Sequence, residues 1–210
     1  PIFKDRYSAQ IRTHYPRERE LELRIVRQEV ELPAAEGVNA SVPDFMEQLI
    51  AELTFQARTH PDVNQASGVS VRMSIANYET LVAAATHRAL RLREQEAVPR
   101  ISDLPALQAS TLGKLELEVA GAERSDAEVF DELCKRATKR IFDECVPQAP
   151  LDRVVKAFDE GWKIEVAAEM AAAEYLQGLD QIPGLREAAR ALARSESPAR
   201  LAAAIEFVLE

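Results

Sequence analysis

Three arginines stand at junctions between predicted elements, where a permanent positive charge can bind an anion. Arg6 lies in the segment FKDRYS, Arg12 in IRTHYP, and Arg72 in SGVSVRMSIANYE. A guanidinium keeps its charge at physiological pH, and its fork of N–H donors matches two oxygens of one phosphate group. The chemistry that these residues offer is therefore phosphate recognition. Considered singly, each arginine also fits the ordinary role of a structural or surface residue.

Arg72 is the most informative of the three because of the residues that follow it. The hydroxyl residue Ser74 precedes an apolar run with helical spacing, which predicts an N-cap at Ser74 and a helix that continues to about Ala97. The start of a helix carries partial positive charge, so a neighbouring arginine gains nothing from it. The arrangement becomes favourable when the arginine and the helix end bind the same anion, such as a phosphate.

Motifs for a complete active site are missing from the sequence. There is no G-x-x-x-x-G-K-[ST] phosphate loop, and the 7 glycines are scattered. The histidines show no metal-ligand spacing, and neither cysteine stands in a motif typical of a nucleophile. The histidines are His14, His60 and His87, and the cysteines are Cys134 and Cys145. We therefore expect no metal site and no self-contained catalytic centre.

The composition restricts the partners and the compartment. Lys and Arg number 26 against 35 Asp and Glu, and the formal charge of −9 argues against nucleic acid as the main partner. No apolar run approaches the roughly 20 residues of a membrane span, and the start is not a signal peptide. Cys134 and Cys145 lie about 16 Å apart along one predicted helix, too far for a disulfide, which favours a reduced, cytoplasmic protein.

Helical periodicity dominates the chain and two-residue alternation is nearly absent, so we expect a mainly α fold. Residues 1–15 are predicted to form a short strand or turn region, and Pro16 then starts a helix. The apolar face of that helix is expected to contain Leu21, Ile25 and Val26. Ser41 is predicted to cap the next helix. The apolar side of this second helix is expected to contain Phe45, Met46, Leu49 and Leu53.

The second half of the chain is also predicted to be helical. Ser102 is expected to cap a short helix, and Ser125 and Glu128 form a capping box at the start of a long one. The apolar stripe of the long helix is Val129, Leu133, Ala137 and Ile141. Further helices are expected at 151–159, 163–179, 184–194 and 198–209. The segment VAGAERS, residues 119–125, gives the best domain boundary.

The order of these motifs resembles the second half of an AAA+ ATPase, in particular the magnesium-chelatase ATPase subunit and its bacterial relatives near the MoxR group. The resemblance covers about residues 1–110. It rests on PIFKDRYSAQIRTHYPRERELELRIVRQE, then a helix, then SGVSVRMSIANYETLVAAATHRAL. In that family an aspartate-arginine-aromatic segment closes the nucleotide-binding core, and a helical lid follows. The fold implied for this chain is a lid-like helical bundle followed by further C-terminal helices.

The resemblance assigns roles to two arginines. Asp5-Arg6-Tyr7 matches the segment whose arginine finger reaches the γ-phosphate bound by the neighbouring subunit, although the family usually has phenylalanine in place of Tyr7. Arg72 matches the lid arginine called sensor 2, which reaches the nucleotide of its own subunit. Arg12 has no secure counterpart. The implied domains are the end of the core (1–16), a lid-like domain (17–120) and a C-terminal helical region (121–210).

The resemblance also implies what the complete protein does. It would bind ATP and Mg2+, assemble as a homo-oligomeric ring, and couple hydrolysis to metal insertion or to remodelling of a partner, such as one with a von Willebrand factor A domain. The chain opens on Pro1 and ends without a C-cap signal, so we expect a fragment of a longer protein, inactive alone because the Walker loop is missing. The alternative is an independent helical interaction module without nucleotide binding.

Overall fold

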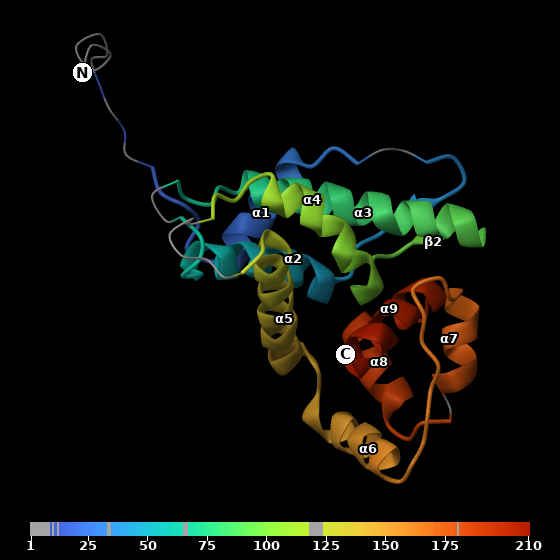
Figure 1. The fold of residues 1–210 in the computed structure, drawn as a ribbon. Coiled ribbons are helices and arrows are strands. Elements are labelled where there is room, and N and C mark those ends of the chain that lie inside the picture. The colour runs from blue at the N-terminus through green and yellow to red at the C-terminus, as the bar shows by residue number, and fades with distance from the viewer. Residues whose placement is uncertain are drawn as a thin grey trace.

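The computed structural model confirms a mainly helical fold (Figure 1). It describes residues 9, 11, 13–32, 35–64, 67–117, 124–179 and 181–210. Within these residues the α-helices are α1 (Arg19–Glu29), α2 (Asp44–Thr59), α3 (Arg72–Leu92), α4 (Leu107–Leu112), α5 (Asp126–Cys145), α6 (Gln148–Asp159), α7 (Ala172–Leu179), α8 (Leu185–Ala193) and α9 (Pro198–Leu209).

Apart from the α-helices, regular secondary structure is limited in the described part of the chain. The strands β1 (Asn39–Ala40) and β2 (Glu96–Ala97) form a short parallel pair, and the 3-10 helix η2 (Ile101–Ala106) leads directly into α4. Of the strand or turn region predicted within residues 1–15, the structure describes residues 9, 11 and 13–15, which have no regular secondary structure.

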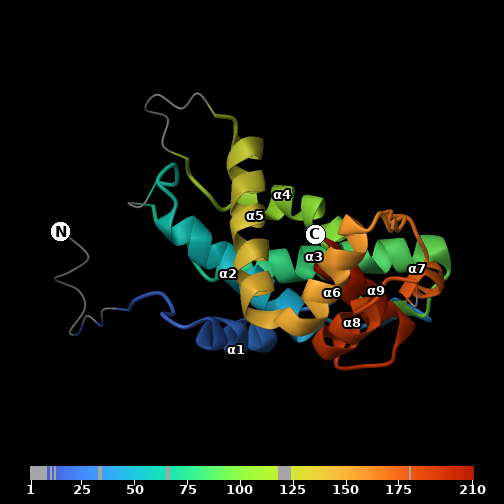
Figure 2. The ribbon, with the colours of Figure 1, turned by 90° about the horizontal axis from the view of Figure 1, so that it is seen from below.

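The first layer of the fold is built from α1, α2 and α3, with α4 along α3 and α5 across α2 (Figures 1 and 2). Its core contains the apolar side chains that the sequence predicted for α2, which are Phe45, Met46, Leu49 and Leu53, all buried. The predicted stripe of α5 is buried as well, from Val129 to Ile141. Burial of these side chains is the main force that holds the layer together.

The C-terminal helices share this core. Helix α9 is buried on all sides, with α7 and α8 packed against it. The ring of Phe207 in α9 lies 4.9 Å from that of Phe45 in α2 and 5.9 Å from that of Phe142 in α5, measured between centroids. One continuous hydrophobic cluster therefore joins α2, α5 and α9. The domain boundary expected at 119–125 overlaps residues 118–123, which lie outside the described part.

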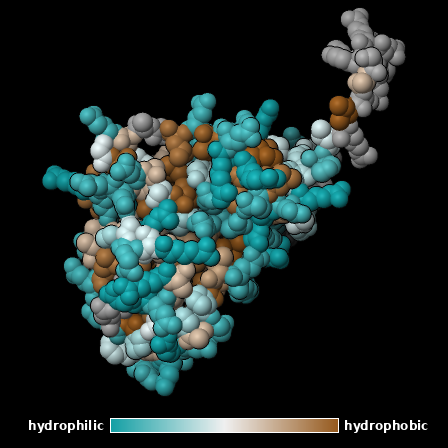
Figure 3. All heavy atoms as spheres, turned by 180° about the vertical axis from the view of Figure 1, so that it is seen from behind, coloured by the Kyte–Doolittle hydropathy of each residue, from teal (hydrophilic) through white to brown (hydrophobic). Residues whose placement is uncertain are grey.

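The outer surface is predominantly hydrophilic on the face seen in Figure 3, where hydrophobic atoms form separate patches between charged side chains. Exposed large apolar residues are nevertheless concentrated at α6 and the segment after it, namely Val155, Phe158, Trp162 and Val166. Helix α6 ends in a left-handed turn at Gly161, where the backbone N–H of Trp162 donates to the carbonyl of Ala157 at 3.1 Å.

Several predicted helix starts are wrong. Helix α3 begins at Arg72, and Ser74 is a buried residue within its first turn rather than the N-cap. The helix ends at Leu92 instead of Ala97, because Arg93 adopts a left-handed conformation with φ 57°. Helix α2 begins at Asp44 with Pro43 in the cap position, so Ser41 does not cap it.

Three further predictions differ from the structure. The buried face of α1 includes Glu22, Leu23 and Val26, whereas Leu21 is 38% exposed. The 3-10 helix η2 begins before Ser102, and its first turn is closed by Asp103, whose carboxylate accepts the backbone N–H of the residue that precedes η2. The helix expected over 163–179 is present only as α7, and residues 163–171 are irregular.

The capping box of α5 is confirmed. Ser125 accepts the backbone N–H of Glu128 at 3.3 Å, and the Glu128 carboxylate accepts the backbone N–H of Ser125 at 2.6 Å. These hydrogen bonds hold the pKa of the Glu128 carboxyl below its usual value. The start of α9 is confirmed as well, with Pro198 in its first turn and the Ser197 hydroxyl as the cap.

Candidate functional site

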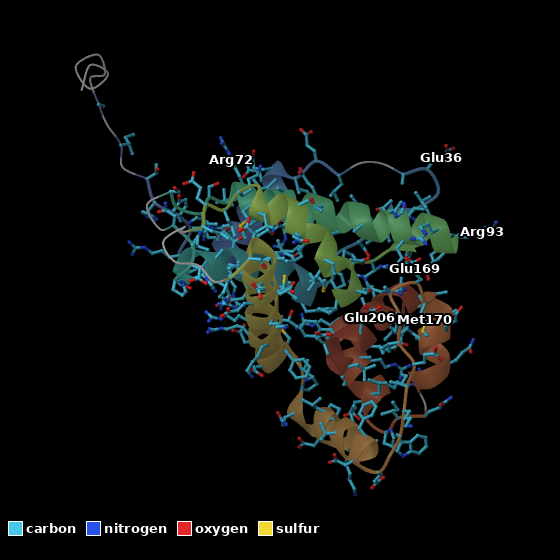
Figure 4. The ribbon with its side chains drawn as sticks, in the orientation of Figure 1. Glu36, Arg72, Arg93, Glu169, Met170 and Glu206 are labelled. Atoms are coloured by element: carbon cyan, nitrogen blue, oxygen red, sulfur yellow. The ribbon has the colours of Figure 1, made fainter. Side chains whose placement is uncertain are left out.

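Arg72 is the first residue of α3, and its side chain is exposed at the end of the bundle where the chain enters (Figure 4). Within the described part of the chain its guanidinium makes no hydrogen bond and no ion pair, while its backbone N–H donates to Ser70 Oγ at 3.3 Å. The first turn of α3 also contains no acidic residue, unlike those of α1, α2 and α5. Among the described residues the Arg72 guanidinium is therefore left without a carboxylate partner, and the first turn of α3 supplies none of its own.

The backbone around Arg72 is fixed from both sides by buried polar contacts. Before it, Arg58 Nε donates to the carbonyl of Val69 at 2.9 Å. After it, Ser74 Oγ donates to Glu22 Oε1 at 2.6 Å, and Arg58 donates to both carboxylate oxygens of Glu22 at 2.6 and 2.9 Å. Glu22 is fully buried. The residues on either side of Arg72 are thus bound to one buried ion pair.

Arg58 also contacts the segment through which the chain enters the bundle. Arg58 Nη1 donates to the carbonyl of Pro16 at 3.5 Å, and its guanidinium carbon lies 5.0 Å from the ring centroid of Tyr15. Tyr15 in turn lies against Gly68, where a Cβ would be 2.4 Å from the tyrosine hydroxyl oxygen and where φ is +69°. The segment that leads out of residues 1–12 therefore packs beside the loop that leads into Arg72.

The other two arginines cannot be placed. Arg6 and Arg12 both lie outside the described residues, so the structure tests neither the arginine-finger role nor the structural one. What the structure does establish is the position of Arg72 relative to Tyr15 and Pro16. Tyr15 and Pro16 are the last residues of the predicted core segment, 1–16, and lie at the same end of the bundle as Arg72.

A second charged cluster lies at the opposite end of α3 and was missed by the sequence analysis. Arg88 donates to both carboxylate oxygens of Asp103 at 3.1 and 2.9 Å, and to the carbonyl of Val98 at 2.7 Å. Arg100 is fully buried and donates to the carbonyl of Met170 at 2.7 Å. Burial, followed by repulsion from Arg88, lowers the pKa of the Arg100 guanidinium.

This cluster joins α3 and η2 to the C-terminal helices. Glu206 in α9 accepts the backbone N–H of Ser102 at 3.1 Å and the hydroxyl of Tyr175 at 2.5 Å, and it lies 3.7 Å from Arg100 Nη1 (Figure 4). Burial raises the pKa of the Tyr175 phenol, as do its hydrogen bond to Glu206 and the charge of that carboxylate. Glu94 accepts the backbone N–H of Ala172 at 2.6 Å and so caps α7. The role of the cluster is to fix one group of helices on the other.

Among the described residues, the remaining reactive side chains do not assemble into a site. Cys134 and Cys145 are free thiols, and burial raises the pKa of Cys134 to about 12. Across the described ranges, no three His, Cys, Asp or Glu side chains converge as metal ligands would. None of the helices placed by the structure has the length and apolar character needed to cross a membrane.

The chain was compared with protein-family models, with curated proteins and with solved structures. No match was found.

Proposed function

We propose that this chain is the lid and C-terminal portion of an AAA+ ATPase similar to the magnesium-chelatase ATPase subunit. In this proposal Arg72 is the sensor 2 arginine and binds the phosphates of ATP held by its own subunit. The observation that carries the proposal is the exposed guanidinium of Arg72 at the start of α3, without an acidic partner among the described residues. A triphosphate placed there would interact with the guanidinium and with the N-terminus of the helix together.

The position of the entry segment supports the same proposal. In this proposal the nucleotide would lie between the core and the lid, close to where the chain passes from one to the other. Tyr15 and Pro16, the last residues of the predicted core segment, lie beside the loop that leads into Arg72. A core placed before them would therefore approach the bundle at the end that carries Arg72.

The complete protein would use ATP and Mg2+ as a ring of identical subunits. Arg6 would act in trans as the arginine finger on the nucleotide of the neighbouring subunit, where such residues contribute about 10³–10⁵ in rate. The ring would couple hydrolysis to metal insertion or to remodelling of a partner protein, such as one with a von Willebrand factor A domain, in the cytoplasm. Residues 1–210 alone would not hydrolyse ATP, because their sequence contains no phosphate loop.

The test is nucleotide binding by the full-length protein with Arg72 replaced by alanine. We expect Arg72→Ala to raise the dissociation constant of ATP by about tenfold or more, since it removes a charged contact to phosphate. Arg91→Ala is the matched control, because Arg91 lies on the same helix in an exposed pair with Glu169, far from the helix start. Equal affinities for both variants and the unaltered protein would contradict the assignment of Arg72.

A second candidate function is an independent helical interaction module without nucleotide binding. It is favoured by the apolar side chains of Val155, Phe158 and Trp162, each more than a third exposed on α6 and the turn after it. Exposed apolar groups gathered in one place mark many protein interaction surfaces. Full-length protein that neither binds nor hydrolyses ATP would favour this function.

A further inference from the structure

The buried contacts on both sides of Arg72 form one network. Glu22 Oε1 accepts from Arg58 Nη2 at 2.9 Å and from Ser74 Oγ at 2.6 Å, and Oε2 accepts from Arg58 Nη1 at 2.6 Å. Ser74 Oγ also lies 2.7 Å from Thr54 Oγ1. The network connects α1 through Glu22, α2 through Arg58 and Thr54, and α3 through Ser74.

The ion pair between Glu22 and Arg58 is not explained by its contribution to stability. Taking a carboxylate and a guanidinium out of water costs several kcal/mol for each ion, and apolar side chains of similar size often serve stability equally well. The neighbouring buried residues of α1, Leu23 and Val26, show that the same face does accommodate apolar groups. What the ion pair does provide is directional contacts, which define where the attached backbone must lie.

The directional contacts of Arg58 and Glu22 are made to residues on either side of Arg72. Arg58 fixes the carbonyl of Val69, three residues before it, and Glu22 fixes the hydroxyl of Ser74, two residues after it. Successive residues of a helix are rotated by about 100°. A shift of the start of α3 by one residue would therefore turn Arg72 to another side of the bundle, and it would break both contacts.

We infer that Glu22, Arg58 and Ser74 are positioning residues that hold the Arg72 guanidinium toward the phosphates of a nucleoside triphosphate. The inference rests on the proposed function, because the phosphate is the ligand assigned there to Arg72. The three residues do not touch the nucleotide. They act through Arg72, so their removal should weaken ATP binding only while Arg72 is present.

Ser74→Ala in the full-length protein tests the inference. Alanine is a good helix former, so the variant removes the hydroxyl contact to Glu22 without opposing the helix. We expect the dissociation constant of ATP to rise by up to about tenfold and by no more than in Arg72→Ala, because Ser74 acts only through Arg72. Ser74→Thr keeps a hydroxyl and should retain most of the affinity.

Thr86→Ala is the matched control for general destabilisation. Thr86 is a buried hydroxyl residue of the same helix, but its Oγ1 donates to the carbonyl of Val82 at 2.8 Å, away from Arg72. We expect this variant to bind ATP within about twofold of the unaltered protein, since its lost hydrogen bond does not touch the network. Urea unfolding of both alanine variants shows whether their losses of stability are comparable.

The double variant Arg72→Ala/Ser74→Ala separates positioning from a structural role. If Ser74 acts through Arg72, the double variant binds ATP as well as Arg72→Ala alone. Independent, additive losses overturn the inference, as does an unchanged affinity of Ser74→Ala when Arg72→Ala is impaired. An unchanged affinity of Arg72→Ala itself overturns the proposed function instead, so the two failures are distinguishable.

Discussion

Glu206 provides a sharp test of how the C-terminal helices are held on the rest of the fold. Its carboxylate, 8% exposed, accepts the Ser102 N–H and the Tyr175 hydroxyl and lies 3.7 Å from Arg100 Nη1. Glu206→Ala removes all three interactions at once. It leaves the fully buried Arg100 beside Arg88 with one negative charge fewer.

The expected loss of stability follows from the burial of the cluster. Removal of one partner from a buried ion pair typically costs about 3–5 kcal/mol, because the other charge remains in a medium that solvates it poorly. Each hydrogen-bond donor left without a partner adds about 1–3 kcal/mol if it stays buried. Relaxation and water entry reduce the sum, so we expect Glu206→Ala to lower the free energy of unfolding by about 3–5 kcal/mol.

Urea unfolding of residues 1–210, followed by far-UV circular dichroism and by the fluorescence of Trp162, measures this loss. Trp162 is the single tryptophan of the chain and follows α6, so its fluorescence reports on the C-terminal helices. Glu196→Ala is the control, because Glu196 pairs with Arg190 at 2.9 Å while its side chain is 70% exposed. Such an exposed pair contributes about 0–1 kcal/mol. Equal losses for Glu206→Ala and Glu196→Ala would refute the role given to the buried cluster.

Two further predictions concern the thiols and the close packing of α6. Cys145 should react with iodoacetamide faster than Cys134 at pH 8, since burial raises the pKa of the Cys134 thiol to about 12 and leaves little thiolate. Mass spectrometry of a time course measures both rates. Faster labelling of Cys134 than of Cys145 would contradict this prediction. Gly184→Ala should lower the free energy of unfolding by more than Gly37→Ala. Both glycines have positive φ, which costs a residue with a Cβ about 1–2 kcal/mol, but only at Gly184 would the Cβ lie 2.4 Å from a backbone carbonyl oxygen of α6. Urea midpoints compare the two, and equal losses would show that the carbonyl moves away at little cost.

Helix starts that depend on neighbouring residues were predictable from the sequence, and those that depend on distant ones were not. The capping box at Ser125 and the cap at Ser197 are complete within four residues; the capping box and the start of the helix at residue 198 were predicted correctly. The prediction of a cap at Ser74 is wrong, because the hydroxyl of Ser74 donates to Glu22, which lies 52 positions away and is not evident from the local sequence. Helix α7 begins at Ala172 because a carboxylate 78 positions away, that of Glu94, accepts its first N–H.

The candidate site shows the same division. Arg72 stands out in the sequence because an arginine at a helix start is unusual, and the structure places it there with an exposed side chain. The residues around it were not predictable. Arg58 and Glu22 are 36 positions apart, and each would pass for a surface residue of an amphipathic helix. Only the packing of α1 on α2 brings them together, with Glu22 fully buried and the Arg58 side chain mostly so.

In the proposed function, Arg72 serves the nucleotide of its own subunit and Arg6 serves that of the neighbouring subunit. Mixing two inactive full-length variants, Arg6→Ala and Arg72→Ala, tests it most directly. In a ring assembled from equal amounts, about a quarter of the interfaces (one half times one half) join an intact Arg72 to an intact Arg6 from the next subunit. The account predicts that each variant alone has little ATPase activity and that the mixture recovers up to about a quarter of the unaltered rate. A mixture no more active than its components would contradict it.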